Sequence, residues 1–358
     1  MPTMRMILTT AALLALGLAG GEVAVLLGLP MPWMLGSLAI CAGLVLLVKP
    51  RVLEGYAFPM RFRSGFVALI GVMIGTQVTP ELLRLAGELP WTVGGLILFV
   101  FLAHMGNMAV FRRLGGYDRA TAFYAGTPGG LMESILLGEG AGADTRILTA
   151  QQFLRIIVTI TVLPLGLSLW MGEPVGSAAG LALASGDAAP ADALGIATIA
   201  VAAFAGMLGA KMLRLPAAQL TGPMLIAAAA TLSGVIDLHL PVWMIAAAQM
   251  VIGVSLGLRF QGLGMALLRR SAWLSVISVS YMLALGAGFA AVLTAITGLE
   301  WLHLLISFAP GGVAEMSVIA LSLAANPALV SLHHILRILL TVVELTLLAK
   351  VLGLKRAA

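Results

Sequence analysis

Ten apolar runs, each long enough for a helix that crosses a lipid bilayer, constrain this chain more than any other feature. A crossing helix needs about 20 apolar residues for hydrocarbon about 30 Å thick. Only 10% of the residues are charged and 61% are hydrophobic, whereas roughly a quarter of a soluble domain carries charge. We therefore predict an all-α polytopic membrane protein in contact with the lipid bilayer. The runs cover residues 6–28, 32–48, 59–78, 91–111, 147–170, 191–213, 219–236, 241–258, 272–297 and 330–352.

The second half of the chain repeats the first half at an offset of 182 residues. Chance does not hold one offset over about a hundred residues, so the pattern indicates a duplication. We predict a first membrane repeat at 1–171, an extracytoplasmic linker at 172–190 and a second membrane repeat at 191–358. An offset of 186 also aligns Leu29-Pro30 with Leu215-Pro216. Matches at 182 include Pro59 with Pro241, Gly71 with Gly253, Gly75 with Gly257, Trp91 with Trp273, and Thr159 with Thr341.

Basic residues gather in alternate loops, and this predicts how the chain crosses the membrane. In the first repeat, Lys and Arg gather near 49–63 and 112–119, whereas 79–90 and 172–190 hold few of them. Because basic loops stay in the cytoplasm, we predict cytoplasmic termini in a bacterial inner membrane. All basic loops lie on the cytoplasmic side if each repeat crosses the membrane about five times. An odd number of crossings inverts the second repeat relative to the first. In the alternative, each Pro-Gly-Gly is a kink in a crossing helix, which gives twelve spans and a parallel duplication.

Each repeat carries one Pro-Gly-Gly within an apolar stretch, at about 114–145 and 300–328. Proline removes a backbone donor and glycine permits unusual φ values, so the helix should break and leave amide groups unpaired. About eight residues on either side make roughly 12 Å of helix, which reaches the middle of the bilayer. We therefore predict broken or re-entrant helices, as in many secondary transporters. The residues at the breaks are Thr127, Pro128, Gly129, Gly130, Pro310, Gly311 and Gly312.

Two carboxylates and two guanidinium groups recur beside these motifs. Glu133 and Glu315 lie in the first turn after each Gly-Gly, where a helix N-terminus favours an anion or a carboxylate. They either cap their own helices or, since ionisable residues within membranes are usually functional, titrate or bind a coupling cation. Arg155 and Arg337 lie one to two turns inside apolar spans. We predict that they pair with the glutamates or clamp an anionic substrate, rather than snorkelling to the interface.

Polar neighbours precede both arginines by about one turn. Gln151 and Gln152 in the first repeat match His333 and His334 in the second, and we expect them to extend a polar lining in which histidine relays protons. Adjacent helical residues point in different directions and no third ligand has suitable spacing, so we predict no metal site. The other histidines, expected to be structural or interfacial, are His104, His239 and His303.

Two Gly-x-x-x-Gly motifs provide small-residue faces for close helix packing. They are Gly71 with Gly75 and, in the second repeat, Gly253 with Gly257. Faces of this kind bring helices together within one chain or across a homodimer.

The set of motifs resembles the AbrB-type bacterial membrane proteins, a duplicated family whose members are labelled putative ammonia monooxygenase or AbrB family transcriptional regulator. That family is similar in organisation to the cation:proton antiporter and anion transporter superfamily, which includes bile acid symporters, and this likeness implies transport. The resemblance covers nearly the whole chain. The residues that carry it are Leu29-Pro30 with Trp33 and Gly36, Thr127 to Glu133, Gly142-Ala143-Asp144 leading to Arg155, Leu215-Pro216 with Gly222-Pro223-Met224, Ala309 to Gly312 with Glu315-Met316-Ser317, and His333-His334 leading to Arg337.

The family labels imply two rival functions, and the residues favour neither. A monooxygenase needs clustered metal ligands, and a transcriptional regulator needs a nucleic-acid-binding surface on a soluble segment. We predict no enzyme, no cofactor and no direct contact with nucleic acid. The expected function is a permease, specifically a secondary transporter of a small anionic solute coupled to protons or cations. The alternative is a membrane-embedded regulator or sensor that influences gene expression without transport.

Overall fold

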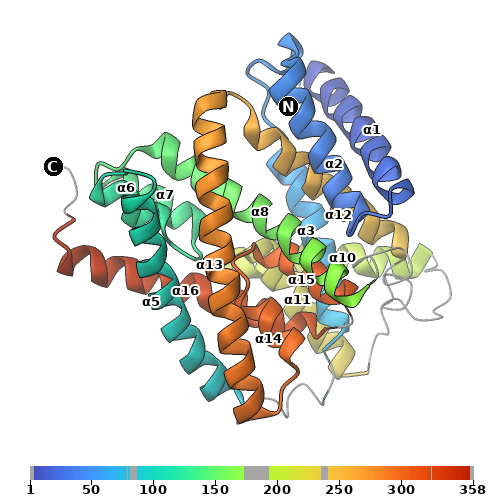
Figure 1. The fold of residues 1–358 in the computed structure, drawn as a ribbon. Coiled ribbons are helices and arrows are strands. Elements are labelled where there is room, and N and C mark those ends of the chain that lie inside the picture. Colours follow the sequence, from blue (N-terminus) through green and yellow to red (C-terminus); the bar gives the residue numbers. More distant parts are fainter. Residues whose placement is uncertain are drawn as a thin grey trace. The chain divides into compact units, whose positions relative to one another are not determined.

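The computed structural model describes residues 4–78, 80, 87–172, 193–234, 241–323 and 325–354. Within these residues the chain forms fourteen α-helices and no strand (Figure 1). The all-helical prediction is therefore confirmed. Except for Gly172, the predicted linker at 172–190 lies outside the described residues.

The chain divides into two compact units, and each unit takes matching parts from both halves of the sequence. The first contains 1–80, 161–262 and 317–328, and the second contains 81–160, 263–316 and 329–358. The first two segments of the second unit begin at residues 81 and 263, which are 182 residues apart, the same as the offset between the repeats. The two units group residues that contact one another and not residues of one repeat. The predicted repeat boundaries, 1–171 and 191–358, therefore stay a prediction.

Helices α8 (Thr145–Met171) and α15 (Val313–Ser322) continue from one unit into the other. The first unit otherwise contains α1 (Met4–Leu26), α2 (Pro32–Gly43), the π-helical turn η1 (Leu44–Val48), η2 (Arg51–Leu53), α3 (Met60–Thr76), α10 (Ala193–Met212), α11 (Ala218–Leu232), α12 (Val242–Gly257) and η4 (Leu258–Phe260). The second contains α5 (Leu89–Arg113), α6 (Arg119–Ala125), α7 (Leu131–Glu139), α13 (Met265–Thr297), α14 (Trp301–Phe308) and most of α16 (Pro327–Val351).

Seven helical segments of the described chain are long and apolar enough to cross a membrane, which identifies a multi-pass membrane protein. They are α1, α5, α8, α10, α12 with η4, α13 and α16. The other three predicted runs form shorter helices, namely α2 with η1, α3 and α11. Helix α11 ends before its predicted limit because Gly234 adopts a φ of +66°, a left-handed conformation that terminates helices.

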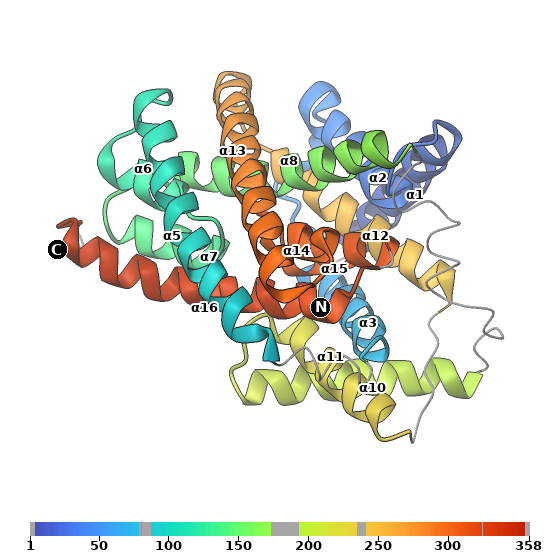
Figure 2. The ribbon, with the colours of Figure 1, turned by 60° about the horizontal axis from the view of Figure 1, so that its bottom comes forward.

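Reciprocal glycine contacts join the two halves of the chain inside the first unit. A Cβ atom added at Gly71 would lie 2.5 Å from the carbonyl oxygen of Leu220, and one at the equivalent Gly253 would lie 2.3 Å from that of Met34. Helix α3 therefore packs closely on α11 (Figure 2), and α12 packs on α2 (Figure 1). The Gly-x-x-x-Gly faces are used for helix packing within the chain.

One close approach in this unit yields a stability prediction. A Cβ at Gly36 of α2 would lie 2.1 Å from the carbonyl oxygen of Gly20 in α1, whereas a Cβ at Gly43 has no atom within 4 Å. Backbone cannot rotate away as a side chain can, so Gly36→Ala should destabilise the protein by about 1–3 kcal/mol. Gly43→Ala should be neutral or stabilising by about 0.5–1 kcal/mol. Thermal unfolding midpoints of the purified chain in detergent test this, and equal midpoints for the two variants would contradict it.

In the second unit the long helices α5 and α13 pack against each other, and each also packs against a short helix of its own half, α6 or α14 (Figure 1). An aromatic cluster joins α5, α13 and α14. The ring of Phe99 meets those of Phe289 and Phe308 edge-on, at centroid distances of 6.0 and 5.3 Å, while Phe289 and Phe308 stack at 5.8 Å. This unit contains both Pro-Gly-Gly breaks, the glutamate that follows each break, and both buried arginines.

Candidate functional site

The segment 119–144 doubles back on itself at its Pro-Gly-Gly. The backbone N–H of Asp144, which follows α7, donates to the hydroxyl of Thr121 in the first turn of α6 at 2.9 Å. A Cβ added at Gly138, near the end of α7, would lie 3.1 Å from the Cβ of Tyr124 in α6. The two ends of the segment therefore lie together, and the break is the far end of a hairpin.

Local sequence explains this hairpin. The Asp118 carboxylate caps α6 by accepting the backbone N–H of Thr121 at 2.9 Å. Partial burial alone would raise the pKa of this carboxyl, but hydrogen bonds from Thr121 and the Ala120 backbone outweigh it and hold that pKa below its usual value. Helix α6 ends at Gly126, and α7 begins after Gly130, whose φ of +59° is costly for residues with a Cβ. The residues from Thr127 to Gly130, Pro128 included, are buried.

The second break lies between α14 and α15. Its backbone makes a tight turn in which the Gly311 N–H donates to the Ala309 carbonyl oxygen at 2.9 Å. A Cβ at Gly312 would lie 2.1 Å from a carboxylate oxygen of Glu315, which is only 4% exposed. The carboxylate is therefore folded back over the glycine that precedes its own helix. Glu315 is the third residue of α15, a position from which a carboxylate stabilises a helix N-terminus.

Glu133 has the corresponding position in the first break. It is the third residue of α7, it is half-buried, and one of its carboxylate oxygens lies 3.5 Å from a Cβ position at Gly130. Both carboxylates thus approach the glycine at the start of their helix. The geometry is compatible with capping, and it also places two ionisable groups beside the breaks.

Two buried arginines donate to the carbonyl oxygens that the breaks leave without helical partners. Arg155 of α8 donates from Nη1 to Thr127, and Arg337 of α16 donates from Nη1 to Ala309 and from Nη2 to Gly311 at 2.6 Å. Their side chains are 6% and 1% exposed. Among the described residues neither guanidinium forms an ion pair, so the carbonyl oxygens take the place of the glutamates that the sequence suggested as partners.

Each break also touches the helix that carries the arginine of the other repeat. The Thr159 hydroxyl of α8, which donates to the Arg155 carbonyl at 2.8 Å, also lies 3.5 Å from the carbonyl oxygen of Pro310. A Cβ at Gly129 would lie 3.1 Å from the Thr341 hydroxyl and 3.5 Å from Cγ of Arg337, both on α16. The second unit thus brings the two Pro-Gly-Gly breaks together around α8 and α16. Figure 2 shows α14 beside α16.

The predicted polar lining divides into two groups. Gln152 reaches the first break and donates to the hydroxyl of Thr127 at 2.8 Å. Gln151 instead joins the loop before α6 to helix α13, because it donates to the Tyr117 hydroxyl at 3.0 Å and accepts from Ser275 at 2.8 Å. Gln151 therefore has a structural role that its match with His333 did not indicate.

His333 and His334 are both buried on α16. Each ring Nδ1 lies 2.9 Å from the carbonyl oxygen four residues earlier, of Leu329 and Val330 respectively. Because a carbonyl only accepts, Nδ1 carries the proton of each neutral ring and Nε2 is an acceptor. Several buried polar atoms at this site have no partner among the described residues, and they include Gln152 Oε1, Arg155 Nε, His333 Nε2, Arg337 Nε and Thr341 Oγ1.

Sequence reasoning missed one contact in this unit. His104 of α5 donates to the carbonyl oxygen of Phe123 at 2.8 Å, and its other ring nitrogen lies 3.2 Å from a carboxylate oxygen of Glu344 on α16. The repeat conceals this pair, since Gly286 and Val162 occupy the equivalent positions. The available signal was a single glutamate inside the apolar run at 330–352.

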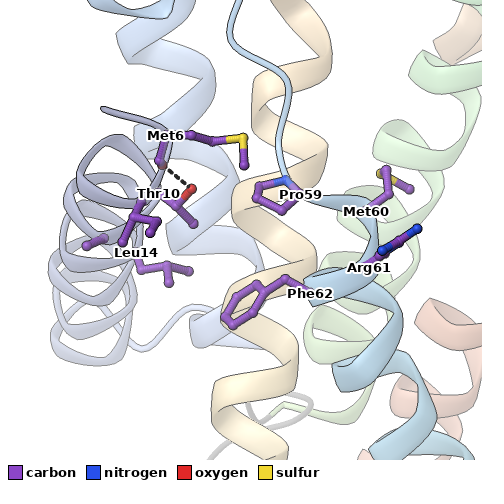
Figure 3. A pocket seen from close by; sticks show the side chains of 9 residues that line it. Met6, Thr10, Leu14, Pro59, Met60, Arg61 and Phe62 are labelled. Atoms are coloured by element: carbon purple, nitrogen blue, oxygen red, sulfur yellow. Dashed lines mark hydrogen bonds between the residues drawn. The ribbon is translucent and has the colours of Figure 1, made fainter. Parts of the chain in front are cut away.

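A separate groove of about 740 Å³ lies in the first unit between α1 and the start of α3 (Figure 3). Thr10 and Arg61 are its polar members, and the other lining side chains are apolar. None of the predicted site residues lines it, and its composition suits a lipid acyl chain better than a polar solute. The groove is therefore separate from the candidate site. Among the described residues, no three His, Cys, Asp or Glu side chains are grouped so as to hold a metal ion.

The sequence matches the family described as "Transition state regulatory protein AbrB" over residues 44–353. The chain belongs to the AbrB family. Its relatives include "Uncharacterized protein YhjN" of Bacillus subtilis (strain 168), which is 25% identical over 92% of this chain and 89% of the relative. Another is "Putative regulator AbrB" of Escherichia coli (strain K12), which is 28% identical over 85% of this chain and 88% of the relative. The resemblance inferred from the motifs is confirmed, and the matched residues of this AbrB-family protein include both breaks.

Proposed function

We propose that this AbrB-family protein is a secondary transporter of a small anionic solute that binds at the two breaks of the second unit. One observation carries the proposal: Arg155 and Arg337 are buried and have no carboxylate partner in the described part of the chain. Burying uncompensated charge costs on the order of several kcal/mol, and a bound anion would relieve that cost.

The two helix starts support the same ligand class. Helices α7 and α15 begin at the breaks, and the free N–H groups and dipole of a helix N-terminus favour negative charge. Glu133 and Glu315 already lie at these positions, so an ionised carboxylate competes with an anionic solute. Protonation, or a cation bound at the carboxylate, would remove the competition and favour the solute. That linkage between two ligands is what coupled transport requires.

For the topology, we propose five crossing segments per repeat and a hairpin that enters and leaves on one side of the membrane. The hydrogen bond between Asp144 and Thr121 at the base of the first hairpin supports this. Helix α6, with 7 residues, is about 10 Å long and too short to cross by itself. The repeats are then inverted, with both termini in the cytoplasm of a bacterial cell. Single cysteines at Arg119 and Glu139, exposed residues on the two flanks of the first break, would test this in a chain whose one native cysteine, Cys41, is replaced by serine. Labelling of the two positions from opposite faces of the membrane would exclude the hairpin.

The alternative is a membrane-embedded sensor that uses the same pocket without net transport. The observation in its favour is the name of the Escherichia coli relative, a putative regulator. We propose no enzymatic activity under either function, since buried arginines beside two helix breaks suit the binding of an anion.

Reconstituted proteoliposomes separate the two functions. We expect radiolabelled small carboxylates or inorganic anions to enter liposomes that contain the protein faster than empty liposomes, and an imposed proton or sodium gradient to drive their accumulation. Saturable binding of an anion without flux under any gradient would favour the sensor. Flux confined to neutral or cationic solutes would contradict the assignment of an anionic substrate.

A further inference from the structure

A second ionisable site lies in the second unit, where α5, α6 and α16 contact one another. The His104 ring on α5 is fully buried, and the Glu344 side chain on α16 is 11% exposed. The ring Nε2 lies 2.8 Å from the carbonyl oxygen of Phe123, and Nδ1 lies 3.2 Å from Oε2 of Glu344. The site uses neither Pro-Gly-Gly and has no equivalent in the other repeat, where Gly286 and Val162 replace the two residues.

The tautomer of His104 follows from its backbone partner. A carbonyl oxygen accepts hydrogen bonds and never donates them, so Nε2 must carry a proton. In a neutral ring the other nitrogen, Nδ1, then presents a lone pair to Glu344. An ionised carboxylate also presents only lone pairs, and two acceptors at 3.2 Å repel each other.

The contact is favourable when one proton is shared between the two groups. Either the proton is on Nδ1, which makes an imidazolium beside a carboxylate, or it is on Glu344, which makes a carboxylic acid that donates to a neutral ring. Both states contain the same number of protons, and they belong to the pair rather than to one residue. Burial strengthens the preference, because an unpaired charge at this depth is costly.

No other ionisable side chain of the described residues lies within 4 Å of either group as an ion-pair partner. The polar neighbour on α5 is Asn107, which donates to the Gly126 carbonyl at 3.1 Å and accepts from Ser278 at 2.8 Å. The other titratable groups on the contacting and adjacent helices are Arg112 and Arg113 of α5, Arg119 and Tyr124 of α6, Glu133 and Glu139 of α7, Arg269, Arg270 and Tyr281 of α13, and His333, His334, Arg337 and Lys350 of α16.

We propose that His104 and Glu344 form a proton-binding site that holds one exchangeable proton between Nδ1 and Oε2. The site is connected to the first break, because His104 binds the Phe123 carbonyl and Asn107 binds that of Gly126, where α6 ends. Loss of the proton would set two acceptors against each other and weaken the packing of α5 and α6 on α16. The proposal does not require anion transport, although it would supply a proton to a coupled cycle.

Histidine ¹⁵N NMR and infrared spectroscopy of the full chain in lipid nanodiscs test the site at about pH 8, above the ordinary range of both groups. We expect wild-type protein to show either a doubly protonated His104 ring or a protonated carboxyl band. The signal should be lost in Glu344→Gln, whose amide replaces the exchangeable proton with a permanent donor.

A matched control exists in the same unit. Glu300 is 76% exposed and lies 3.4 Å from His303, so Glu300→Gln replaces a solvent-exposed carboxylate near a histidine. It should leave the His104 signal and the buried carboxyl band unchanged. A wild-type His104 that is neutral at pH 8, with no protonated carboxyl band, would overturn the proposal. An unchanged spectrum in Glu344→Gln would do the same. Failure of the flux experiment alone would leave these results standing, because neither measurement uses a transported solute.

Discussion

Arg337→Gln should abolish transport and destabilise the protein more than any other single substitution at the breaks. Its guanidinium donates to the carbonyl oxygens of Ala309 and Gly311, which have no helical partners. A hydrogen bond to a charged group contributes about 1.5–3 kcal/mol, so the two together contribute about 3–6 kcal/mol. Without them the turn at the second break should loosen, and the anion would lose one of its two cations.

The equivalent arginine provides an internal comparison. Arg155 holds a single carbonyl oxygen, that of Thr127, so Arg155→Gln should lower the thermal unfolding midpoint by about half as much. Arg337→Lys retains the charge but loses the forked geometry, so it should restore stability only in part. Arg146→Gln is the control, since Arg146 is exposed on α8. Equal unfolding midpoints for Arg337→Gln and Arg146→Gln would show that the carbonyl contacts have no energetic role.

The second large effect is expected from replacing both carboxylates at the breaks. In the Glu133→Gln, Glu315→Gln double variant, solute should still equilibrate across the membrane but should no longer accumulate against its gradient. Glutamine keeps the size of glutamate and one acceptor oxygen, but its amide cannot take up and release a proton as a carboxylate does and cannot bind a cation by charge. In the double variant no carboxylate competes with the solute at the helix starts. Solute binding is therefore no longer linked to protonation or to cation binding.

Accumulation ratios in proteoliposomes with an imposed proton or sodium gradient measure this effect. We expect Glu315→Gln to lower the ratio more than Glu133→Gln, because Glu315 is 4% exposed whereas Glu133 is half-buried and more accessible to solvent. Glu139→Gln, at the exposed end of α7, should behave as wild type. Full gradient-driven accumulation by the double variant would remove these residues from the coupling mechanism.

The helices were largely predictable because the membrane imposes its requirement on every short window of sequence. A span must be apolar over about 20 residues whatever its neighbours are, and composition alone reveals that. The ends were less predictable. Helix α3 has 17 residues, and Leu44–Val48 widens into a π-helical turn after α2. These details depend on how closely a helix must approach its neighbour, as at Gly71 and Gly36.

By itself, the sequence determined the helical membrane class, the duplication, and the pairing of each Pro-Gly-Gly with one arginine, because those features are local or repeat at a constant offset. The tertiary structure decided which groups meet. It placed Arg155 and Arg337 on carbonyl oxygens rather than on glutamates, held Gln151 away from the break that Gln152 reaches, and brought His104 to Glu344. Such contacts depend on the rotation of each helix about its axis, which packing against distant segments sets and no local pattern records.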